Sequence, residues 1–418
     1  MFNILYSFGI FLFGKGIQLA AFFNRKAKLW VEGRKGLFER LEKTLKAAAR
    51  QDHPILWFHV SSLGEFEQGR PLIEDIRKKF PSYRILLTFF SPSGYELRKD
   101  YDQADFVFYL PLDTRRNVKR WIEMVNPALV VFVKYDYWYN FLDALHRKDI
   151  PVIFISALFR PSHLFFKKYG AWFRRRLQTI QWFFVQDERS EELLHSIGIQ
   201  NLTVCGDTRF DRVYSIAANV KPFPLIAKFC EGNRIVVCGS TWKEDEDRLL
   251  PMIGTIQPGV KFIIAPHDVS QSRIEELTSR LQQPWVRYSE MKNDNLAGKK
   301  ILVINTVGIL SQLYQYADLA YIGGGFGSGI HNIQEPITFG VPVIFGPGYY
   351  KFKEAVDLIE QGGAFSISTA AEFEEKSGAV LSDPDLRRQM AERCRNYVEQ
   401  HRGATARILE GLTSRHLL

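Results

Sequence analysis

Short runs of β-branched and aromatic residues alternate with helical patterns along most of the chain. The first half contains the runs ILWFHV, RILLTFF, FVFYLPL, ALVVFV and VIFISA. The second half contains RIVVCGS, KFIIAPH, ILVINT, LAYIGGG and PVIFGP. Nearly continuous apolar strands flanked by helices are typical of parallel sheets covered on both faces. Two such series predict an α/β protein with two doubly wound, Rossmann-like domains.

The predicted domain boundary lies where the strand pattern stops. Residues 217–233 hold two prolines and no strand-like run, which is typical of a linker. We therefore expect one Rossmann-like domain at 26–216 and a second at 234–370. Residues 371–418 have a helical pattern, and their end could cross back to the first domain.

The N-terminal segment is almost continuously apolar from Phe2 to Phe23, with the single charge of Lys15. A basic cluster follows it: Arg25, Lys26, Lys28, Arg34 and Lys35. About 20 apolar residues can span a bilayer, and positive charge after an apolar run favours a cytoplasmic location for the rest of the chain. Residues 1–25 are predicted to be a retained membrane anchor, because no small-residue cleavage site precedes the basic cluster. Lys15 and three glycines favour an interfacial helix over a spanning one, and a buried N-terminal helix is the alternative.

Composition and charge agree with a globular protein at a membrane. The 418 residues are 46% hydrophobic and 24% charged, and the net charge is +9. Residues 1–210 hold 32 Lys and Arg against 22 Asp and Glu, so the excess positive charge lies in the first half. Such a half is attracted to polyanions or anionic lipid, although a solvated basic face remains open. The four cysteines lack CxxC spacing, which indicates reduced thiols in the cytoplasm.

The stretch GGGFGSGIHNIQEP, residues 323–336, follows a predicted strand and opens the next helix. Glycines let a backbone approach a ligand closely, and a helix N-terminus favours a phosphate. Glu335 could accept hydrogen bonds from ribose hydroxyls, so the stretch predicts a nucleotide-sugar site. It does not match G-x-G-x-x-G, so no dinucleotide cofactor is expected. A capping box formed by Asn332 and Glu335 is the alternative.

Other strand ends carry polar residues of the same kind. Ser240 and Thr241 follow the run VVCG, where they could hold a phosphate or cap a helix. The stretch WFHVSSLGE places polar side chains after the first strand but lacks the G-x-S-x-G elbow of a serine nucleophile. No D-x-D or H-E-x-x-H occurs at a strand or helix end, so neither a metal nor a cofactor is predicted.

Together, several segments resemble one family, the membrane-associated transferases that move 3-deoxy-D-manno-oct-2-ulosonic acid (Kdo) from CMP-Kdo to the lipid A precursor. The matching stretches are GRKGLFER, WFHVSSLGE, YLPLD, FVQDERSEELLHSIGI, VCGDTRFD, VVCGST and GIHNIQEPITFGVPVIFGP, in family order from about residue 33 to residue 352. The resemblance implies the two-domain GT-B glycosyltransferase architecture. It also implies an inverting, metal-independent transfer to lipid IVA at the cytoplasmic face of the bacterial inner membrane, without a nucleic-acid partner.

The resemblance also assigns roles to single residues. Glu39 of GRKGLFER takes the place of the catalytic base, although spacing alone favours a helix-surface carboxylate paired with Arg40 or Lys43. The implied donor-binding residues are Arg209, Ser240, Thr241, His267, Gly325, Asn332 and Glu335. The implied acceptor-binding residues are Ser61, Ser62, Glu65 and Lys134. Cationic and N–H groups suit the donor side, because the departing phosphate gains negative charge.

Three segments depart from the family pattern. KYDYWYN stands where ETELWPN is common, so Lys134 and Asp136 replace two glutamates, and Lys134 could instead pair with the carboxylate of the sugar. APHDVSQSR keeps His267 but not the arginine before it, and NTVGIL replaces DTxGEL. Arg273 or Lys243 could supply the missing cation. Two alternatives stay open: another GT-B enzyme that uses a UDP-sugar and a lipid acceptor, and a non-catalytic nucleotide-sugar-binding membrane protein.

Overall fold

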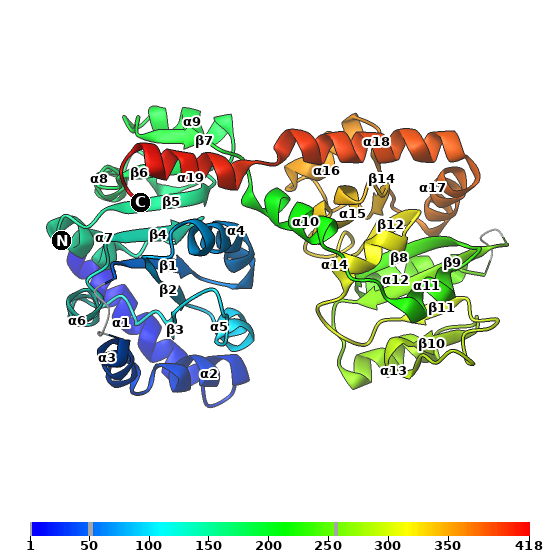
Figure 1. Cartoon of the computed structure of the whole chain (residues 1–418), viewed down its shortest axis with the longest axis horizontal. Coiled ribbons are helices and arrows are strands. Elements are labelled where there is room, and N and C mark those ends of the chain that lie inside the picture. The colour runs from blue at the N-terminus through cyan, green and yellow to red at the C-terminus, as the bar shows by residue number, and fades with distance from the viewer. Residues whose placement is uncertain (1, 49–52, 255–257) are drawn as a thin grey trace. The chain divides into compact units, whose positions relative to one another are not determined.

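The structure is a computed structural model and describes residues 2–48, 53–254 and 258–418. The chain forms two compact units. Unit 1 comprises Met1–Arg212 and Gly403–Leu418, and unit 2 comprises Val213–Arg402. Each unit is an α/β layer structure with helices on its sheet (Figure 1). The two predicted doubly wound domains are therefore confirmed.

Within the described ranges, unit 1 is built on a seven-stranded parallel sheet with the order β3-β2-β1-β4-β5-β6-β7. The strands are β1 (Ile55–Val60), β2 (Arg84–Phe89), β3 (Phe106–Tyr109), β4 (Leu129–Val133), β5 (Val152–Ala157), β6 (Trp182–Val185) and β7 (Leu202–Val204). Their side chains are buried almost throughout, as expected of a sheet covered on both faces.

Helices cover both faces of this sheet. One face packs on α3 (Leu37–Ala48), α6 (Arg115–Val125), α7 (Tyr139–Arg147), α8 (Ala171–Leu177) and α9 (Glu188–His195). The other face packs on α4 (Leu63–Lys79) and α19 (Ala404–Ser414), with α5 (Pro92–Arg98) beside α4. Trp57 and Trp121 fill the first core and Phe66 and Phe89 the second, all fully buried. Apolar residues on alternating sides of the strands thus explain the two helical layers.

The N-terminal helix α1 (Phe2–Ala20) is long and apolar enough to cross a membrane. One of its faces docks on unit 1. The Tyr6 hydroxyl donates to Asp113 at 2.6 Å, the Asn3 amide oxygen accepts from Trp172 and Arg176, and Gly14 lies against Leu112. The exposed large side chains on and just after α1 are Phe2, Ile4, Leu5, Phe8, Phe11, Leu12, Phe13, Leu19, Phe22 and Phe23. The helix is therefore one-sided, and the short helix α2 (Arg25–Arg34) turns the chain back onto the unit.

Within the described part of the chain, unit 2 also holds a seven-stranded parallel sheet, with the order β10-β11-β9-β8-β12-β13-β14. The strands are β8 (Arg234–Thr241), β9 (Val260–Pro266), β10 (Trp285–Arg287), β11 (Ile301–Val303), β12 (Leu319–Ile322), β13 (Val343–Phe345) and β14 (Ala364–Ser366). The helices are α11 (Pro224–Cys230), α12 (Lys243–Leu249), α13 (Gln271–Ser279), α14 (Leu310–Leu313), α15 (Gln334–Thr338), α16 (Lys353–Glu360), α17 (Ala370–Ser382) and α18 (Pro384–His401). One core of this unit joins the sheet to α12, α13, α17 and α18.

The domain limits differ from the predicted ones in two places. Residues 217–233 contain helix α11, whose Ile226 and Phe229 are fully buried, so most of the expected linker is part of unit 2. The helix α10 (Thr208–Ala218) contains the boundary itself. At the other end α17 and α18 belong to unit 2, whereas α19 returns to unit 1, as the helical tail suggested (Figure 1). Prolines marked this boundary in the sequence, but Pro224 only begins a helix.

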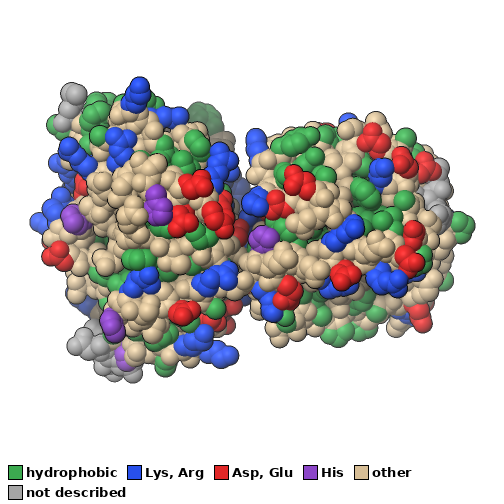
Figure 2. Space-filling view, turned by 90° about the horizontal axis from the view of Figure 1, so that it is seen from above, with side chains coloured by type: hydrophobic (Ala, Val, Ile, Leu, Met, Phe, Trp, Pro, Cys, Tyr) green, Lys and Arg blue, Asp and Glu red, His purple; other side chains and the backbone are tan. Residues whose placement is uncertain are grey.

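Surface charge is mixed on the face drawn in Figure 2, where Lys and Arg side chains alternate with Asp and Glu on each unit. The positive excess of the first half is therefore not gathered into one patch on that face. The four cysteines are all free, and Cys205, Cys238 and Cys394 are buried.

Candidate functional site

A cavity of about 280 Å³ lies at the carboxyl ends of the central strands β8 and β12 of unit 2. The chain leaves β8 towards β9 on one side and leaves β12 towards β13 on the other, so the topology reverses between them. Ligands of open α/β sheets bind at such switch points. The cavity is lined by Gly239, Ser240, His267, Gly308, Leu310, Ser311, Tyr314, Ile322, His331, Asn332 and Glu335. Four predicted donor residues, Ser240, His267, Asn332 and Glu335, are thus brought together.

The backbone at the end of β8 is strained. Ser240 has φ +53°, which is rare for a residue with a side chain, and its neighbour Gly239 leaves no room for a Cβ beside the Tyr314 hydroxyl. A Cβ on Gly323 would lie 2.2 Å from the Ser240 carbonyl oxygen. Strand ends β8 and β12 therefore approach each other at glycines, and this approach positions Ser240 in the cavity wall.

The glycine-rich turn is shaped mainly by contacts with the protein itself. Gly325 abuts the backbone of Gly346, and the Gly324 N–H donates to Asp245 at 2.9 Å. The His331 N–H then donates to the Gly323 carbonyl at 3.0 Å. This hydrogen bond brings the chain back to the cavity. The sequence predicted a ligand next to these glycines, but protein atoms occupy the space beside Gly323 and Gly325. The turn instead delivers the side chains that come after it.

Asn332 and Glu335 stand together at the start of α15. The Asn332 amide donates to Glu335 at 3.3 Å, and its carbonyl oxygen accepts from the Gln334 N–H at 3.0 Å. The N-cap residue of α15 is Ile333, which has no side-chain cap, so Asn332 stabilises the turn before the helix and is not its cap. Both Asn332 and Glu335 also line the cavity. These two hydrogen bonds fix the direction of the Asn332 amide at the cavity wall.

Three aromatic rings stack at the mouth of this site. The His267 ring lies 4.6 Å from that of Trp242 and 4.4 Å from that of His331, and the Trp242 indole N–H donates to His331 Nε2 at 2.9 Å. Burial, together with the neighbouring His267, lowers the pKa of His331 to about 4. His331 is therefore a neutral imidazole at neutral pH. Sequence patterns did not single out Trp242 and His331, although the first comes directly after Thr241 and the second directly before Asn332.

Thr241 does not line the cavity. Its side chain is buried, and its hydroxyl donates to Glu246 at 3.0 Å. The fully buried Glu246 also accepts from Arg273 at 2.5 Å and from Arg280 at 3.3 Å. Burial raises the pKa of Glu246 despite these partners. Thr241 and Arg273 thus hold a buried carboxylate in the structure.

The suggested replacement cations do not reach the cavity. Arg273 is committed to Glu246 and Glu276, and Lys243 pairs with Asp247 one helical turn away on α12. None of the described residues that line the cavity is a lysine or an arginine. Its polar groups are two imidazoles, hydroxyls, one amide and one carboxylate. Among the described residues, moreover, no three His, Cys, Asp or Glu side chains are grouped as metal ligands.

Unit 1 repeats this arrangement at the carboxyl ends of β1 and β4, where its own topology reverses. The Ser61 hydroxyl donates to Asp136 at 2.5 Å, and the Ser62 hydroxyl donates to Glu65. Lys134, directly after β4, has φ +70°, and burial and the nearby Arg209 lower the pKa of its ammonium group. The predicted acceptor residues Ser61, Ser62, Glu65 and Lys134 therefore lie at one edge of this sheet.

Arg209 belongs to unit 1, near this edge. Its guanidinium pairs with Asp207 at 2.6 Å, and Asp207 also accepts from Gln68. Although burial opposes it, the positive charge of Arg209 lowers the pKa of Asp207. Whereas the sequence groups Arg209 with the donor residues of the second half, the fold places it beside Lys134.

A buried histidine network underlies this edge. His59 is fully buried, accepts from the Trp138 indole N–H at 3.1 Å, and lies 2.9 Å from Thr88. Burial lowers the pKa of His59 to about 3 and raises the pKa of Asp136 to about 7. Asp136 Oδ2 has no hydrogen-bond partner in the described part of the chain. Asp136, which stands where the family pattern has a glutamate, thus places a largely buried carboxyl group with a raised pKa just after β4.

Glu39, the predicted base, lies in the first turn of α3 with 69% of its side chain exposed. Its Oε1 is 3.5 Å from an Arg120 guanidinium nitrogen on α6. The predicted local partner Arg40 instead donates to the carbonyls of Gly33 and Lys35. Glu39 is therefore an accessible carboxylate held by a cation from another helix.

Comparison with known proteins gives a family match that lies within unit 1 and relatives that cover both units. The family described as 3-Deoxy-D-manno-octulosonic-acid transferase (kdotransferase) matches residues 35–212. The 3-deoxy-D-manno-octulosonic acid transferase of Chlamydia pneumoniae is 26% identical over 86% of this chain and 85% of the relative. The enzyme of the same name from Aquifex aeolicus is 28% identical over 82% of this chain and 91% of the relative.

Solved structures agree on the fold. The UDP-N-acetylglucosamine 2-epimerase from Listeria monocytogenes has a TM-score of 0.63 at 14% identity, covering 87% of this chain and 97% of the other. At that identity the likeness concerns the fold alone, two Rossmann-like domains of the GT-B kind. Fold and relatives together define the class, and the chain is a glycosyltransferase. Within that class its sequence is similar to the Kdo transferases, at 26% and 28% identity to the two relatives named above.

Proposed function

We propose that the protein transfers Kdo from CMP-Kdo to a hydroxyl of the lipid A precursor, with inversion and without a metal, in lipopolysaccharide synthesis. The observation that carries the proposal is the cavity at the β8/β12 switch point. Residues that the family resemblance assigns to the donor line it side by side. The names of the relatives supply the sugar.

In this proposal the cavity of unit 2 binds the cytidylate. Glu335 accepts hydrogen bonds from the ribose, and the fixed Asn332 amide and the Ser240 hydroxyl contact polar atoms of the nucleotide. The imidazoles of His267 and His331 donate to phosphate oxygens. Hydrogen bonds aimed at the phosphate gain strength as its negative charge grows in the transition state.

Glu39 acts as the general base. An exposed carboxylate can accept the proton of an attacking hydroxyl, and Arg120 restricts its orientation. The hydroxyl oxygen forms a bond to the anomeric carbon as the bond from that carbon to the CMP oxygen breaks on the opposite face. This displacement inverts the configuration.

The helix α1 attaches the enzyme to the cytoplasmic face of the inner membrane, where the acceptor lies. Its docked face contacts unit 1 from Asn3 to Gly14, so the helix would lie in the interface with its exposed phenylalanines among the acyl chains. A membrane-spanning arrangement would require those contacts to separate.

The test measures CMP released from CMP-Kdo in the presence of lipid IVA. We expect Glu39→Gln to lower the rate at least a hundredfold, within the range of general-base contributions, with CMP binding unchanged. Glu42→Gln is the matched control. Glu42 is exposed on the same helix and forms an ion pair with Lys46, one turn further along. Release from a UDP-sugar but not from CMP-Kdo would refute the donor, and an active Glu39→Gln variant would refute the base.

A further inference from the structure

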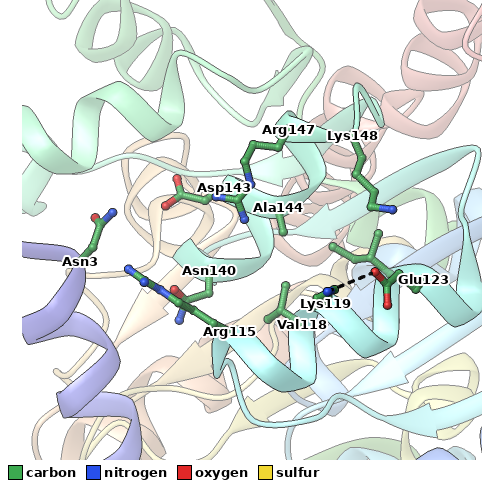
Figure 3. Close-up of a pocket in the computed structure, with 11 residues that line it drawn as sticks. Asn3, Arg115, Val118, Lys119, Glu123, Asn140, Asp143, Ala144, Arg147 and Lys148 are labelled. Atoms are coloured by element: carbon green, nitrogen blue, oxygen red, sulfur yellow. Dashed lines mark ion pairs between the residues drawn. The ribbon is translucent and has the colours of Figure 1, made fainter.

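A second and larger cavity, of about 570 Å³, lies on unit 1 between α6, α7 and the first turn of α1 (Figure 3). It is lined by Asn3, Arg115, Val118, Lys119, Ile122, Glu123, Asn140, Asp143, Ala144, Arg147 and Lys148. We call it the α6/α7 groove. It shares no residue with the cavity of unit 2, and the proposed reaction gives it no role.

The groove combines an apolar floor with cationic walls. Val118 and Ile122 are buried on α6, and Ala144 faces them from α7. Four cationic side chains line the groove: Arg115, Lys119, Arg147 and Lys148. Figure 3 shows Arg115 and Arg147 on opposite sides of it, from α6 and from the end of α7.

Most of this positive charge is not neutralised within the protein. The carboxylate of Asp143 is held by Arg176 at 2.8 Å, and Glu123 lies 4.0 Å from Lys119. Arg115, Arg147 and Lys148 form no ion pair with a carboxylate in the described ranges. An anion with an apolar body is therefore the ligand that the groove suits. Arginine favours phosphate, which it can bind through two parallel hydrogen bonds.

The position of the groove indicates where such an anion comes from. Asn3 belongs to α1, and its side chain is tied to Trp172 and Arg176 beside the groove. Tyr6, one turn further along α1, stacks edge-on with Tyr139 at the start of α7. The exposed apolar face of α1 begins at the same place, with Phe2, Ile4 and Leu5. A lipid with its acyl chains beside that face could place its phosphate in the groove.

We infer that the α6/α7 groove binds the phosphate headgroup of an anionic membrane lipid, distinct from the reacting acceptor. The inference rests on the interfacial attachment of α1 in the proposed function. The groove adjoins the proposed catalytic base through α6, which supplies Arg120 to Glu39. A headgroup bound here would fix the orientation of α6 and α3 on the membrane.

The test is vesicle sedimentation with the full chain at low salt. Phosphatidylcholine vesicles are compared with vesicles that also contain phosphatidylglycerol. The variant Arg115→Gln with Arg147→Gln should bind the anionic vesicles about tenfold to thirtyfold more weakly, because each cation near such a surface contributes a severalfold gain. Lys78→Gln with Lys79→Gln removes the same charge from α4 and should change binding less than threefold.

Two further arms keep the inference separate from the proposed function. Phe8→Gln with Phe11→Gln should weaken binding to both kinds of vesicle, whereas the groove variant should bind pure phosphatidylcholine like the wild type. If the groove and control variants lost binding to anionic vesicles equally, and circular dichroism showed both to be folded, the assignment of a headgroup site to the groove would be overturned.

Inorganic phosphate is the other source of the same chemistry. Binding of millimolar inorganic phosphate that is lost in the groove variant, without any displacement of the wild-type protein from anionic vesicles, would overturn the lipid assignment. A groove variant that binds anionic vesicles normally but has a raised KM for lipid IVA would also overturn it, in favour of the acceptor. Neither result would bear on the proposed role of Glu39 as the general base.

Discussion

At the residue scale, the hydrogen bond between Trp242 and His331, in the stack with His267, determines the protonation state of His331. His331 Nε2 accepts the Trp242 indole N–H, so that nitrogen has no proton of its own and the imidazole is neutral. A proton on Nε2 would break this hydrogen bond and place positive charge 4.4 Å from the His267 ring centre. The stack therefore requires low proton affinity at His331.

The first prediction concerns the pKa of His331, expected at about 4 against 6.5 in the unfolded chain. Because the folded-state pKa is lower, the unfolded chain takes up the proton first as the pH falls. The stabilising contribution of His331 is thus present above pH 6.5 and is lost as the pH falls from about 6.5 to about 4. Histidine-selective NMR, with the signal assigned by His331→Gln, should give a midpoint near 4.

A residue-specific measurement is needed because other buried groups act in the opposite direction. Burial raises the pKa of Asp113 and of Asp136 to about 7, so each of them favours the folded state as the pH falls below that value. A global unfolding curve would sum these effects. An NMR midpoint near 6.5 for His331 would contradict the buried, hydrogen-bonded imidazole.

At the scale of elements, the central strands other than β6 were predicted, and so was the edge strand β3, whereas the short edge strands β7, β10 and β14 were not. ILWFHV and VIFISA coincide with β1 and β5. The edge strands β10 and β14 have three residues each, as does β7, and their runs are too short to show a period. These strands exist because a neighbouring strand offers hydrogen bonds, which is information from the sheet and not from the local sequence.

The glycine-rich turn provides the second prediction. Gly323→Ala would place a Cβ 2.2 Å from the Ser240 carbonyl oxygen, and a backbone atom at a strand end cannot move aside easily. We expect a loss of about 1–3 kcal/mol in the free energy of unfolding, together with weaker nucleotide binding. Urea denaturation and CMP titration measure the two effects.

Gly327→Ala is the matched control in the same turn. The nearest atom to a Cβ at Gly327 lies at 3.7 Å, an ordinary contact, so the free energy of unfolding should change by less than about 0.5 kcal/mol. Equal effects of the two substitutions would show that the β8/β12 approach does not constrain the turn.

At the scale of the whole molecule, the chain returns to unit 1 only in its last helix. Asp211 accepts hydrogen bonds from the Gly403 N–H and from Thr405, and Arg407 donates to the Cys205 carbonyl. The apolar face of α19 then packs on the unit 1 sheet, where Gly411 lies against Phe184. The sequential order of the domains is therefore not their structural order.

The third prediction tests this return. Deletion of residues 403–418 removes the buried side chains of Ile408, Leu409 and Leu412, each worth about 1.5–3 kcal/mol. Hydrogen exchange measured by mass spectrometry should show lost protection in β6 and α4 and unchanged protection in β8 and β12. Glu410→Gln, on the exposed side of α19, should leave both units as in the wild type. Uniform protection after the deletion would contradict the assignment of α19 to unit 1.

The sequence by itself determined the features that depend on neighbouring residues: the two series of strands, the apolar N-terminal helix, the turn after LAYI and the motifs of the family. Only the tertiary structure decided which side chains meet. It turned Thr241 into the core, joined Trp242 to His331 across 89 positions, and assembled a cationic groove from Asn3, Arg115 and Arg147. Local patterns arise from backbone geometry and burial, whereas such pairs depend on the order of strands in a sheet, which no short stretch encodes.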